Sequence, residues 1–217
     1  MNNCILLDFD GTITTKDTTR ALLNELVKLR PWRVFGVVWF GFKMVSSNNS
    51  VTQQAYKNRA IGHLIAGLTD SHMSRALSGF SKKVTALYRP CMLKKIKKAD
   101  ENGTSVLIVT ASPSFAISYC FSDLPVIVVG TEFKKNGDVY CGQLHGQNCY
   151  GSEKVNRIEY WVRDRSMDIY FTEAWSDHFS DYPMLKMAEK RYWIGGELLR
   201  EIVRERDPSG NFVLNEG

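Results

Sequence analysis

Short apolar runs alternate with stretches of helical spacing along most of the chain. The apolar runs, which are typical of buried strands, occupy 4–9, 105–109, 126–129, 167–172 and 192–194. The helical stretches occupy 89–102, 113–121, 151–163 and 183–190. Strands that are connected through helices form a mostly parallel sheet with right-handed crossovers and a helical layer on each face. The pattern therefore predicts the α/β class.

One long block interrupts this alternation. Residues 17–88 show helical spacing and no convincing strand, with a polar loop, SSNNS, at 46–50 between two helical stretches. We therefore predict a helical domain at 14–88, inserted between two parts of a core domain, 1–13 and 89–217.

Three local patterns add detail to the core. Asn136 and Gly137 form a dipeptide that strongly favours a hairpin, which predicts an antiparallel pair within 131–143. A turn is expected at 110–112, after the second strand. The tail 207–217, DPSGNFVLNEG, is predicted to be loose.

The longest apolar stretch lies in the segment from Trp32 to Val45. It is too short to span a bilayer, which needs ~20 residues. Two interpretations remain open: a helix packed inside the insert, or a helix whose Trp39 and Phe42, with Lys43 nearby, contact a membrane surface. The first is the commoner use of such a stretch, and we expect burial here.

Composition and charge exclude several classes of protein. The 217 residues are 44% hydrophobic and 24% charged, which is typical of a globular protein and excludes a wholly disordered chain. The net charge of +5 is too small to indicate a nucleic-acid partner. The five scattered cysteines contain no C-x-x-C pair, which argues against a disulfide framework or zinc knuckle. The N-terminus lacks a basic signal region, so we expect a cytoplasmic protein, and the oligomeric state stays open.

Polar residues gather where the predicted strands end, and ligands of such sheets bind beyond the carboxyl ends of the strands. These residues are, in chain order, Asp8, Asp10, Gly11, Thr12, Thr110, Ala111, Lys154, Asp177 and Asp181. Clustered carboxylates repel one another in a poorly solvated cleft, and Mg²⁺ resolves this repulsion by accepting carboxylate and carbonyl oxygens. Hydrogen-bond donors beside a metal are typical of a site for phosphoryl chemistry.

The first motif, DFDGT, has the chemistry for both halves of a phosphoryl transfer. Asp8 and Asp10 lie two residues apart, so an extended segment projects both to one side. One can attack phosphorus while the other moves a proton. Gly11 permits a tight turn that would bring its N–H and that of Thr12 close to phosphate oxygens.

The ordered set DFDGT, VTAS, a helical lysine and SDHFSD resembles the haloacid dehalogenase superfamily. The helical block between the first two motifs resembles the cap of its phosphoserine-phosphatase-like branch (subfamily IB). The resemblance implies a Rossmann-like, three-layer parallel-sheet core with an inserted helical cap. It also implies that Asp8 is the nucleophile, that Asp10 is the general acid and base, and that Thr110 and Lys154 anchor the phosphate.

The resemblance further implies a bound Mg²⁺. Its ligands would be Asp8, the Asp10 carbonyl and Asp177, with Asp181 supporting the site. Asp181 has a second interpretation, as a cap for the helix that starts near Pro183.

The substrate implied by the resemblance is a small phosphorylated molecule, either a metabolite or a phospholipid head group. Phosphoserine phosphatases usually carry DxDST and a glutamate where this chain has DFDGT and Asp17. The segments CYGSEKV, AWSDHFSDYPML and KRYWIGG look closer to a bacterial phosphatidylglycerophosphate phosphatase. The candidates for substrate selection are Asp17, Arg59 and His178, and Lys57 could likewise bind an anionic group. The simpler interpretation places Lys57 and Arg59 on a solvated helix face. For His178, the simpler interpretation is a surface histidine without a role in binding.

Four functions follow from these observations. We expect a Mg²⁺-dependent phosphatase that acts through an aspartyl-phosphate. The alternatives are a lipid phosphatase at the inner face of the membrane, a phosphoserine phosphatase, and a phosphotransferase that uses the same intermediate. A non-enzymatic module would not need the intact carboxylate set.

Overall fold

A six-stranded sheet, parallel throughout, forms the centre of the computed structural model, which describes residues 2–165 and 168–214. Its strands in spatial order are β3 (Val126–Thr131), β2 (Ser105–Pro113), β1 (Asn2–Leu7), β6 (Ile169–Ser176), β7 (Lys190–Gly195) and β8 (Asn211–Leu214). The connecting helices are α5 (Pro90–Glu101), α6 (Ser114–Cys120), α7 (Ser152–Asp164), α8 (Tyr182–Leu185) and α9 (Glu197–Arg206). The α/β class is confirmed.

Both faces of the sheet are covered. Along β1, Ile5 and Leu7 enter one apolar cluster with α5 and α6, whereas Cys4 and Leu6 enter a second cluster with α7 and α8. A strand that is buried on both faces is apolar at consecutive positions. This explains the continuous runs that marked the central strands in the sequence.

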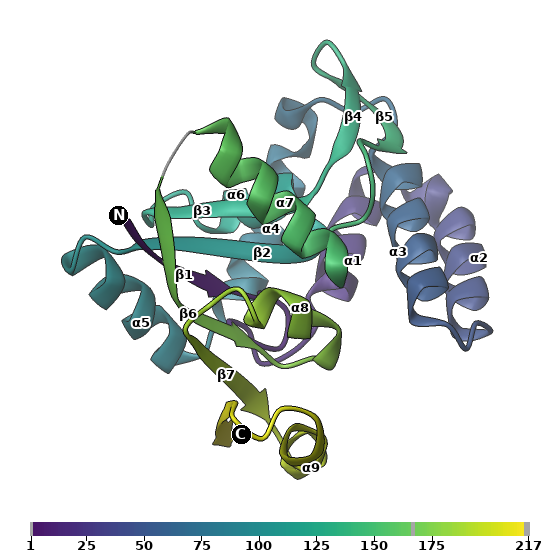
Figure 1. Cartoon of the computed structure of the whole chain (residues 1–217). Helices are drawn as coiled ribbons and strands as arrows, with labels where there is room; N and C mark the ends of the chain where they lie inside the picture. Colours follow the sequence, from purple (N-terminus) through teal and green to yellow (C-terminus); the bar gives the residue numbers. More distant parts are fainter. Residues whose placement is uncertain (1, 166–167, 215–217) are drawn as a thin grey trace.

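The strand order creates a crevice beside β1. The chain runs from β1 outward through β2 to β3, then returns to the other side of β1 as β6 (Figure 1). The carboxyl ends of β1 and β6 therefore flank the point at which the order reverses, where ligands of such sheets bind. Asp8 directly follows β1, and Asp177 directly follows β6.

Four helices lie between β1 and α5: α1 (Thr19–Leu29), α2 (Val34–Val45), α3 (Ser50–Ile65) and α4 (Asp70–Thr85), with a 3₁₀ turn, η1, at Pro31–Arg33. Thr14 and Tyr88 form a bridge where this insert leaves and rejoins the core. Leu26, Ile61 and Phe80 of the insert belong to the same apolar cluster as one face of the sheet. The insert thus shares a core with the sheet, and a separate domain at 14–88 stays a prediction.

The predicted hairpin is confirmed as β4 (Phe133–Asn136) and β5 (Val139–Leu144), whose turn contains Gly137 at φ +59°. It packs on the insert. The Gly67 N–H donates to the Tyr140 carbonyl at 2.8 Å, and the Tyr140 N–H donates to the Leu68 carbonyl at 2.9 Å. These hydrogen bonds therefore hold the hairpin against the residues that follow α3.

Two expectations about strands need correction. The expected turn at 110–112 is part of β2, which continues to Pro113 after an irregularity in its pairing with β3. The expected strand 167–172 is observed as Ile169–Ser176, and Met167 lies outside the described residues. β6 continues through the polar Glu173 because β1 and β7 both pair with it there.

The tail is not loose over the residues that the structure describes. Asn211–Leu214 forms edge strand β8, which pairs with β7, and 215–217 lie outside the described residues. Asp207 anchors this region: it is buried and accepts hydrogen bonds from Arg191 at 2.9 Å and from the Trp193 indole at 2.8 Å. The polar sequence DPSG looked like a loose tail, but it forms a turn that the contacts of Asp207 hold in place.

The apolar segment at 32–45 was expected to be buried, and this is wrong for α2, the helix that it forms. No residue of α2 is buried, because α1, α3 and α4 complete the apolar cluster and α2 packs on the outer side of α3. Among the described residues, no helix is both long and apolar enough to cross a bilayer.

We expect Asp207→Ala to lower the free energy of unfolding by about 2–3 kcal/mol, because the Arg191 and Trp193 donors lose their buried partner. Urea unfolding measures the change. Glu197→Ala is the matched control, since the Glu197 carboxylate is exposed and pairs with Arg200; its effect should stay below about 0.5 kcal/mol. Equal effects of the two substitutions would contradict the anchoring role.

The loss of stability in Asp207→Ala should also depend on pH. Burial raises the pKa of the Asp207 carboxyl, but hydrogen bonds from Arg191 and Trp193 outweigh burial and lower the pKa below its ordinary value of 3.8. A lowered folded-state pKa contributes stability above the ordinary value, and this stability is lost as the pH falls through the folded-state pKa. The difference between wild type and Asp207→Ala should therefore shrink in acid.

Candidate functional site

A cavity of about 350 Å³ lies where the carboxyl ends of the strands face the insert. On the core side it is lined by the predicted residues Asp8, Asp10, Gly11, Thr110, Ala111, Lys154, Asp177, His178 and Asp181. The insert and the loop that leads to it contribute Asp17, Ser50, Gln53, Gln54 and Lys57. Of the predicted set, Thr12 is buried beneath the cavity and Arg59 lies outside it.

Lys154 lies in the first turn of α7 and is only 2% exposed. Its ammonium donates to Asp8 Oδ1 at 2.6 Å and to Asp181 Oδ2 at 2.7 Å. Ser176 Oγ also donates to Asp181 Oδ2, at 2.8 Å. Asp181 makes no side-chain capping hydrogen bond to the helix at Pro183, so its alternative interpretation is not supported. One buried cation thus joins carboxylates that are 173 positions apart in the sequence.

Burial dominates the electrostatics of these groups. Burial raises the pKa of Asp8 to about 8, although Lys154 opposes this shift. Burial, together with the nearby charge of Asp181, raises the pKa of Asp177 to about 6. Burial lowers the pKa of Lys154, but its two carboxylate partners outweigh this and raise it. Lys154 therefore remains cationic, and three carboxylates face a single ammonium.

The turn after β1 brings Asp8 and Asp177 together. The Thr12 hydroxyl lies 3.2 Å from Asp8 Oδ2 and 3.5 Å from Asp177 Oδ1. Gly11 has φ +81°, and a Cβ atom there would lie 1.9 Å from Asp177 Oδ2. The position therefore requires glycine for its backbone conformation and for the space that Asp177 occupies.

One expectation about this turn needs correction. The N–H groups of Gly11 and Thr12 were expected to face phosphate, but each has a partner inside the turn. The Gly11 N–H donates to the Thr14 hydroxyl at 3.3 Å, and the Thr12 N–H donates to the Phe9 carbonyl at 3.3 Å. The turn closes on itself because Ile13 and Thr14 also donate to Phe9.

The oxygen atoms present here suit Mg²⁺. Asp8 and Asp177 supply carboxyl groups whose pKa values are raised chiefly by burial, and a divalent cation would stabilise their charged forms. Within 2–165 and 168–214, no three His, Cys, Asp or Glu side chains are arranged to hold a metal. The expected ligand set has two such side chains, with the Asp10 main-chain carbonyl as the third protein ligand.

Asp10 is held by donors from two parts of the chain. Its Oδ1 accepts from the N–H and the hydroxyl of Thr18, both at 2.7 Å, and its Oδ2 accepts from Ser112 Oγ at 2.6 Å. Sequence reasoning missed both partners. Ser112 had a signal, since it stands two residues after Thr110 and strand alternation places both on one side. Thr18 had none, because its contact depends on how the insert begins.

Lys57 faces the cavity from the insert. It is 8% exposed, and its ammonium lies 3.4 Å from Asp17 Oδ2. Burial raises the pKa of Asp17, but Lys57 and hydrogen bonds from Thr19 outweigh it and lower the pKa. Arg59, in contrast, lies over the Tyr56 ring outside the cavity.

His178 lines the rim of the cavity and is exposed. Its Nδ1 accepts from the Ser180 N–H at 3.1 Å and contacts the Ser180 hydroxyl at 2.8 Å. These contacts fix the turn between Asp177 and Asp181, so the imidazole has a local structural role.

Residues 5–186 match the model of the haloacid dehalogenase-like hydrolase family. The chain belongs to this family of hydrolases. Among curated relatives, protein CicA of Caulobacter vibrioides is 26% identical over 190 residues, covering 86% of this chain and 83% of that protein.

Solved structures of other proteins share the fold of this chain. A protein of unknown function from Bordetella pertussis Tohama I superposes with a TM-score of 0.80 at 16% identity and 98% coverage of both chains. A phospho-aspartyl intermediate analogue of phosphoserine phosphatase superposes with a TM-score of 0.63 at 15% identity, covering 99% of this chain and 94% of that chain.

Gly11→Ala tests the close approach of the turn to Asp177, and Gly137→Ala is its control. Both glycines have positive φ, so each substitution should cost about 1–2 kcal/mol of stability. Only a methyl group at Gly11 displaces a carboxylate, since nothing lies within 4 Å of the Cβ position of Gly137. Hydrolysis of an aryl phosphate should fall about 100-fold in Gly11→Ala and stay unchanged in Gly137→Ala. Equal activity of the two variants would contradict this arrangement.

Proposed function

We propose that this hydrolase is a Mg²⁺-dependent phosphatase that cleaves a phosphomonoester through an aspartyl-phosphate on Asp8. The observation that carries the proposal is the meeting of Asp8, Asp177 and Lys154 around one cavity at the switch point of the sheet. The family assignment supports the reaction class. The fold shared with a phosphoserine phosphatase that holds a phospho-aspartyl analogue agrees with it.

In the first step, Asp8 attacks phosphorus, and the bond from phosphorus to the ester oxygen breaks. Lys154 and Thr12 contact opposite oxygens of the Asp8 carboxylate and hold its orientation. Asp10 gives a proton to the departing alkoxide, so the product leaves as an alcohol. Thr18 and Ser112 hold the Asp10 carboxyl group in place for this transfer.

In the second step, water attacks the phosphorus of the aspartyl-phosphate. Asp10 removes a proton from this water, the bond from Asp8 to phosphorus breaks, and inorganic phosphate is released. Lys154 and the hydroxyl of Thr110, which both line the cavity, offer donors to the phosphoryl oxygens.

Mg²⁺, held by Asp8, the Asp10 carbonyl and Asp177, would balance the carboxylate charges and the charge that develops on the phosphoryl oxygens. Burial raises the pKa of Asp8 and so opposes its ionisation, whereas a cation beside it would favour the carboxylate form. The carboxylate form is the nucleophile, so the proposal requires a cation in the site.

Asp8→Asn should reduce hydrolysis of an aryl phosphate in Mg²⁺ by about 10⁴-fold or more, because the amide cannot act as the nucleophile. The fold should survive, since burial already disfavours a charge at this position. Steady-state kinetics and circular dichroism measure the two effects. Asp138→Asn, at an exposed position of the hairpin turn, is the control and should retain full activity. Retained activity of a folded Asp8→Asn protein would overturn the proposal.

The acceptor of the phosphoryl group is decided in the same assay. Water as acceptor releases one inorganic phosphate for each alcohol formed, even when a second alcohol is added. A new phosphate ester of the added alcohol would assign the chain as a phosphotransferase.

The size of the cavity fits a small phosphorylated molecule or the head group of a larger one. Selection among such substrates would fall to the insert, because the core residues address phosphate and metal. Lys16 and Lys57 both line the cavity, and Lys57 is the buried one of the two, so its charge would attract an anionic substrate most strongly.

Lys57→Ala should raise KM for an aryl phosphate about 10-fold and leave kcat within a few-fold, since an ammonium at the mouth contributes to binding in the ground and transition states alike. Arg59→Ala removes a cation from the same helix but outside the cavity, and should change neither constant. Equal KM changes in both variants would show that only the overall charge of the insert matters.

A further inference from the structure

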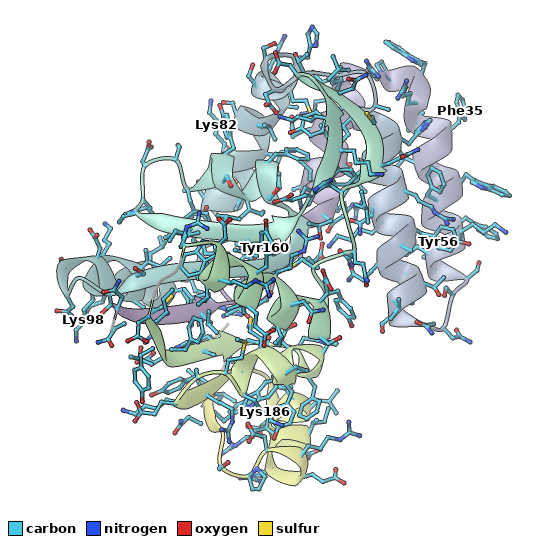
Figure 2. The ribbon with its side chains drawn as sticks, turned by 45° about the horizontal axis from the view of Figure 1, so that its top comes forward. Phe35, Tyr56, Lys82, Lys98, Tyr160 and Lys186 are labelled. Atoms are coloured by element: carbon cyan, nitrogen blue, oxygen red, sulfur yellow. The ribbon has the colours of Figure 1, made fainter. Side chains whose placement is uncertain are left out.

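Helix α2 presents an apolar face that nothing in the described chain covers. The side chains on this face, together with Trp32 of the preceding turn η1, are between 58% and 80% exposed; those of α2 are Phe35, Val38, Trp39, Phe42 and Val45. Their spacing of three or four residues places them along one side of the helix. Figure 2 shows Phe35 at the outer edge of the molecule, pointing away from the other helices. Exposed apolar patches of this kind mark interaction sites.

The opposite side of α2 is engaged with the insert. α2 packs on α3, where the Phe40 ring lies 6.1 Å from the ring of His63. A Cβ atom at Gly36 would lie 2.4 Å from His63 Nε2, so the two helices approach closely there. The helix is therefore fixed by one face, and its orientation leaves the aromatic side chains in solvent.

Charge around this face points to its occupant. None of the chain's 23 acidic residues lies between 26 and 69, whereas this stretch contains six Lys or Arg residues. Several of these cations contact neutral groups: Arg30 and Arg33 donate to main-chain carbonyls, and Lys43 lies 5.1 Å above the Trp39 ring. Two of the six cations are paired elsewhere, Lys28 with Glu25 and Lys57 with Asp17. An apolar aromatic helix whose one charged residue is Lys43, in a stretch without carboxylates, is complementary to a surface that is both apolar and anionic.

We propose that α2 docks this protein on the surface of an anionic lipid bilayer. The aromatic side chains would enter the boundary between head groups and acyl chains, where Trp is favoured, and Lys43, above the Trp39 ring, would face the anionic head groups. A second copy of the chain or an apolar protein partner would cover the aromatic side chains but would not account for the absence of acidic residues from the whole stretch.

The docking face and the cavity share one helical hairpin. The loop after α2 leads into α3, whose Ser50, Gln53 and Lys57 line the cavity. Figure 1 shows α2 as the outermost helix of the insert, with α3 between it and the sheet. Attachment through α2 would therefore hold the mouth of the cavity near the lipid head groups, whatever reaction takes place inside.

Co-sedimentation with vesicles tests the proposal. Wild-type protein should sediment with vesicles of phosphatidylcholine and phosphatidylglycerol in equal parts, and at least about 10-fold less with phosphatidylcholine alone. The double variant Trp39→Glu, Phe42→Glu should bind the mixed vesicles at least about 10-fold more weakly than wild type. The control Tyr160→Glu, Leu198→Glu alters two exposed apolar side chains elsewhere and changes the net charge equally, so it should bind like wild type.

Several outcomes would overturn docking through α2. These are no sedimentation of the wild type, equal binding to both vesicle types, or equal losses in the two double variants. Analytical ultracentrifugation adds another: a dimer that Trp39→Glu, Phe42→Glu abolishes, without vesicle binding by the wild type, would assign the face to a second copy of the chain. Unchanged circular dichroism and aryl phosphate hydrolysis would show that each variant is folded, and these readouts are independent of lipid.

Discussion

The ammonium of Lys154 holds two buried carboxylates, Asp8 from the first strand and Asp181 from the loop after β6, at the centre of the site. A carboxylate removed from water is costly unless a cation or donor compensates for the loss of hydration. Lys154 compensates two of them at once, and α7 places it there because its first turn begins beside the strand ends. The geometry of the site therefore depends on where this helix starts.

The compensation is incomplete. Three carboxylates share one lysine, so the folded chain retains an excess of negative charge where β1 and β6 end. This excess lowers stability in the metal-free protein, and under the proposed function a divalent cation would balance it. Stability and function are opposed in this part of the molecule, and the apolar clusters on both faces of the sheet contribute the stability that the site lacks.

Local patterns sufficed for the central strands, the hairpin and the carboxylate set. Each rests on a short-range property: continuous apolar residues in a doubly covered strand, a turn that needs positive φ at Gly137, or polar residues that follow a strand directly. Strand β8 and the exposure of α2 could not be predicted in this way. Both depend on which surfaces the other elements leave free. The contact of Asp10 with Thr18 and the position of Lys57 in the cavity depend on how the insert packs against the core, which a local pattern does not contain.

The hairpin limits how the insert can move. Main-chain hydrogen bonds join Tyr140 to Gly67 and Leu68, and Gly62 lies so close to Gly142 that a side chain on either would collide with main chain. A wide swing of α3 away from the sheet would break these bonds and separate this contact. The resistance is strongest at the carboxyl end of α3 and weakest at its amino end, beside the cavity. The contacts with the hairpin therefore restrain the carboxyl end of α3, and the tip of the α2–α3 hairpin, beside the cavity, lies at the opposite end of the helix.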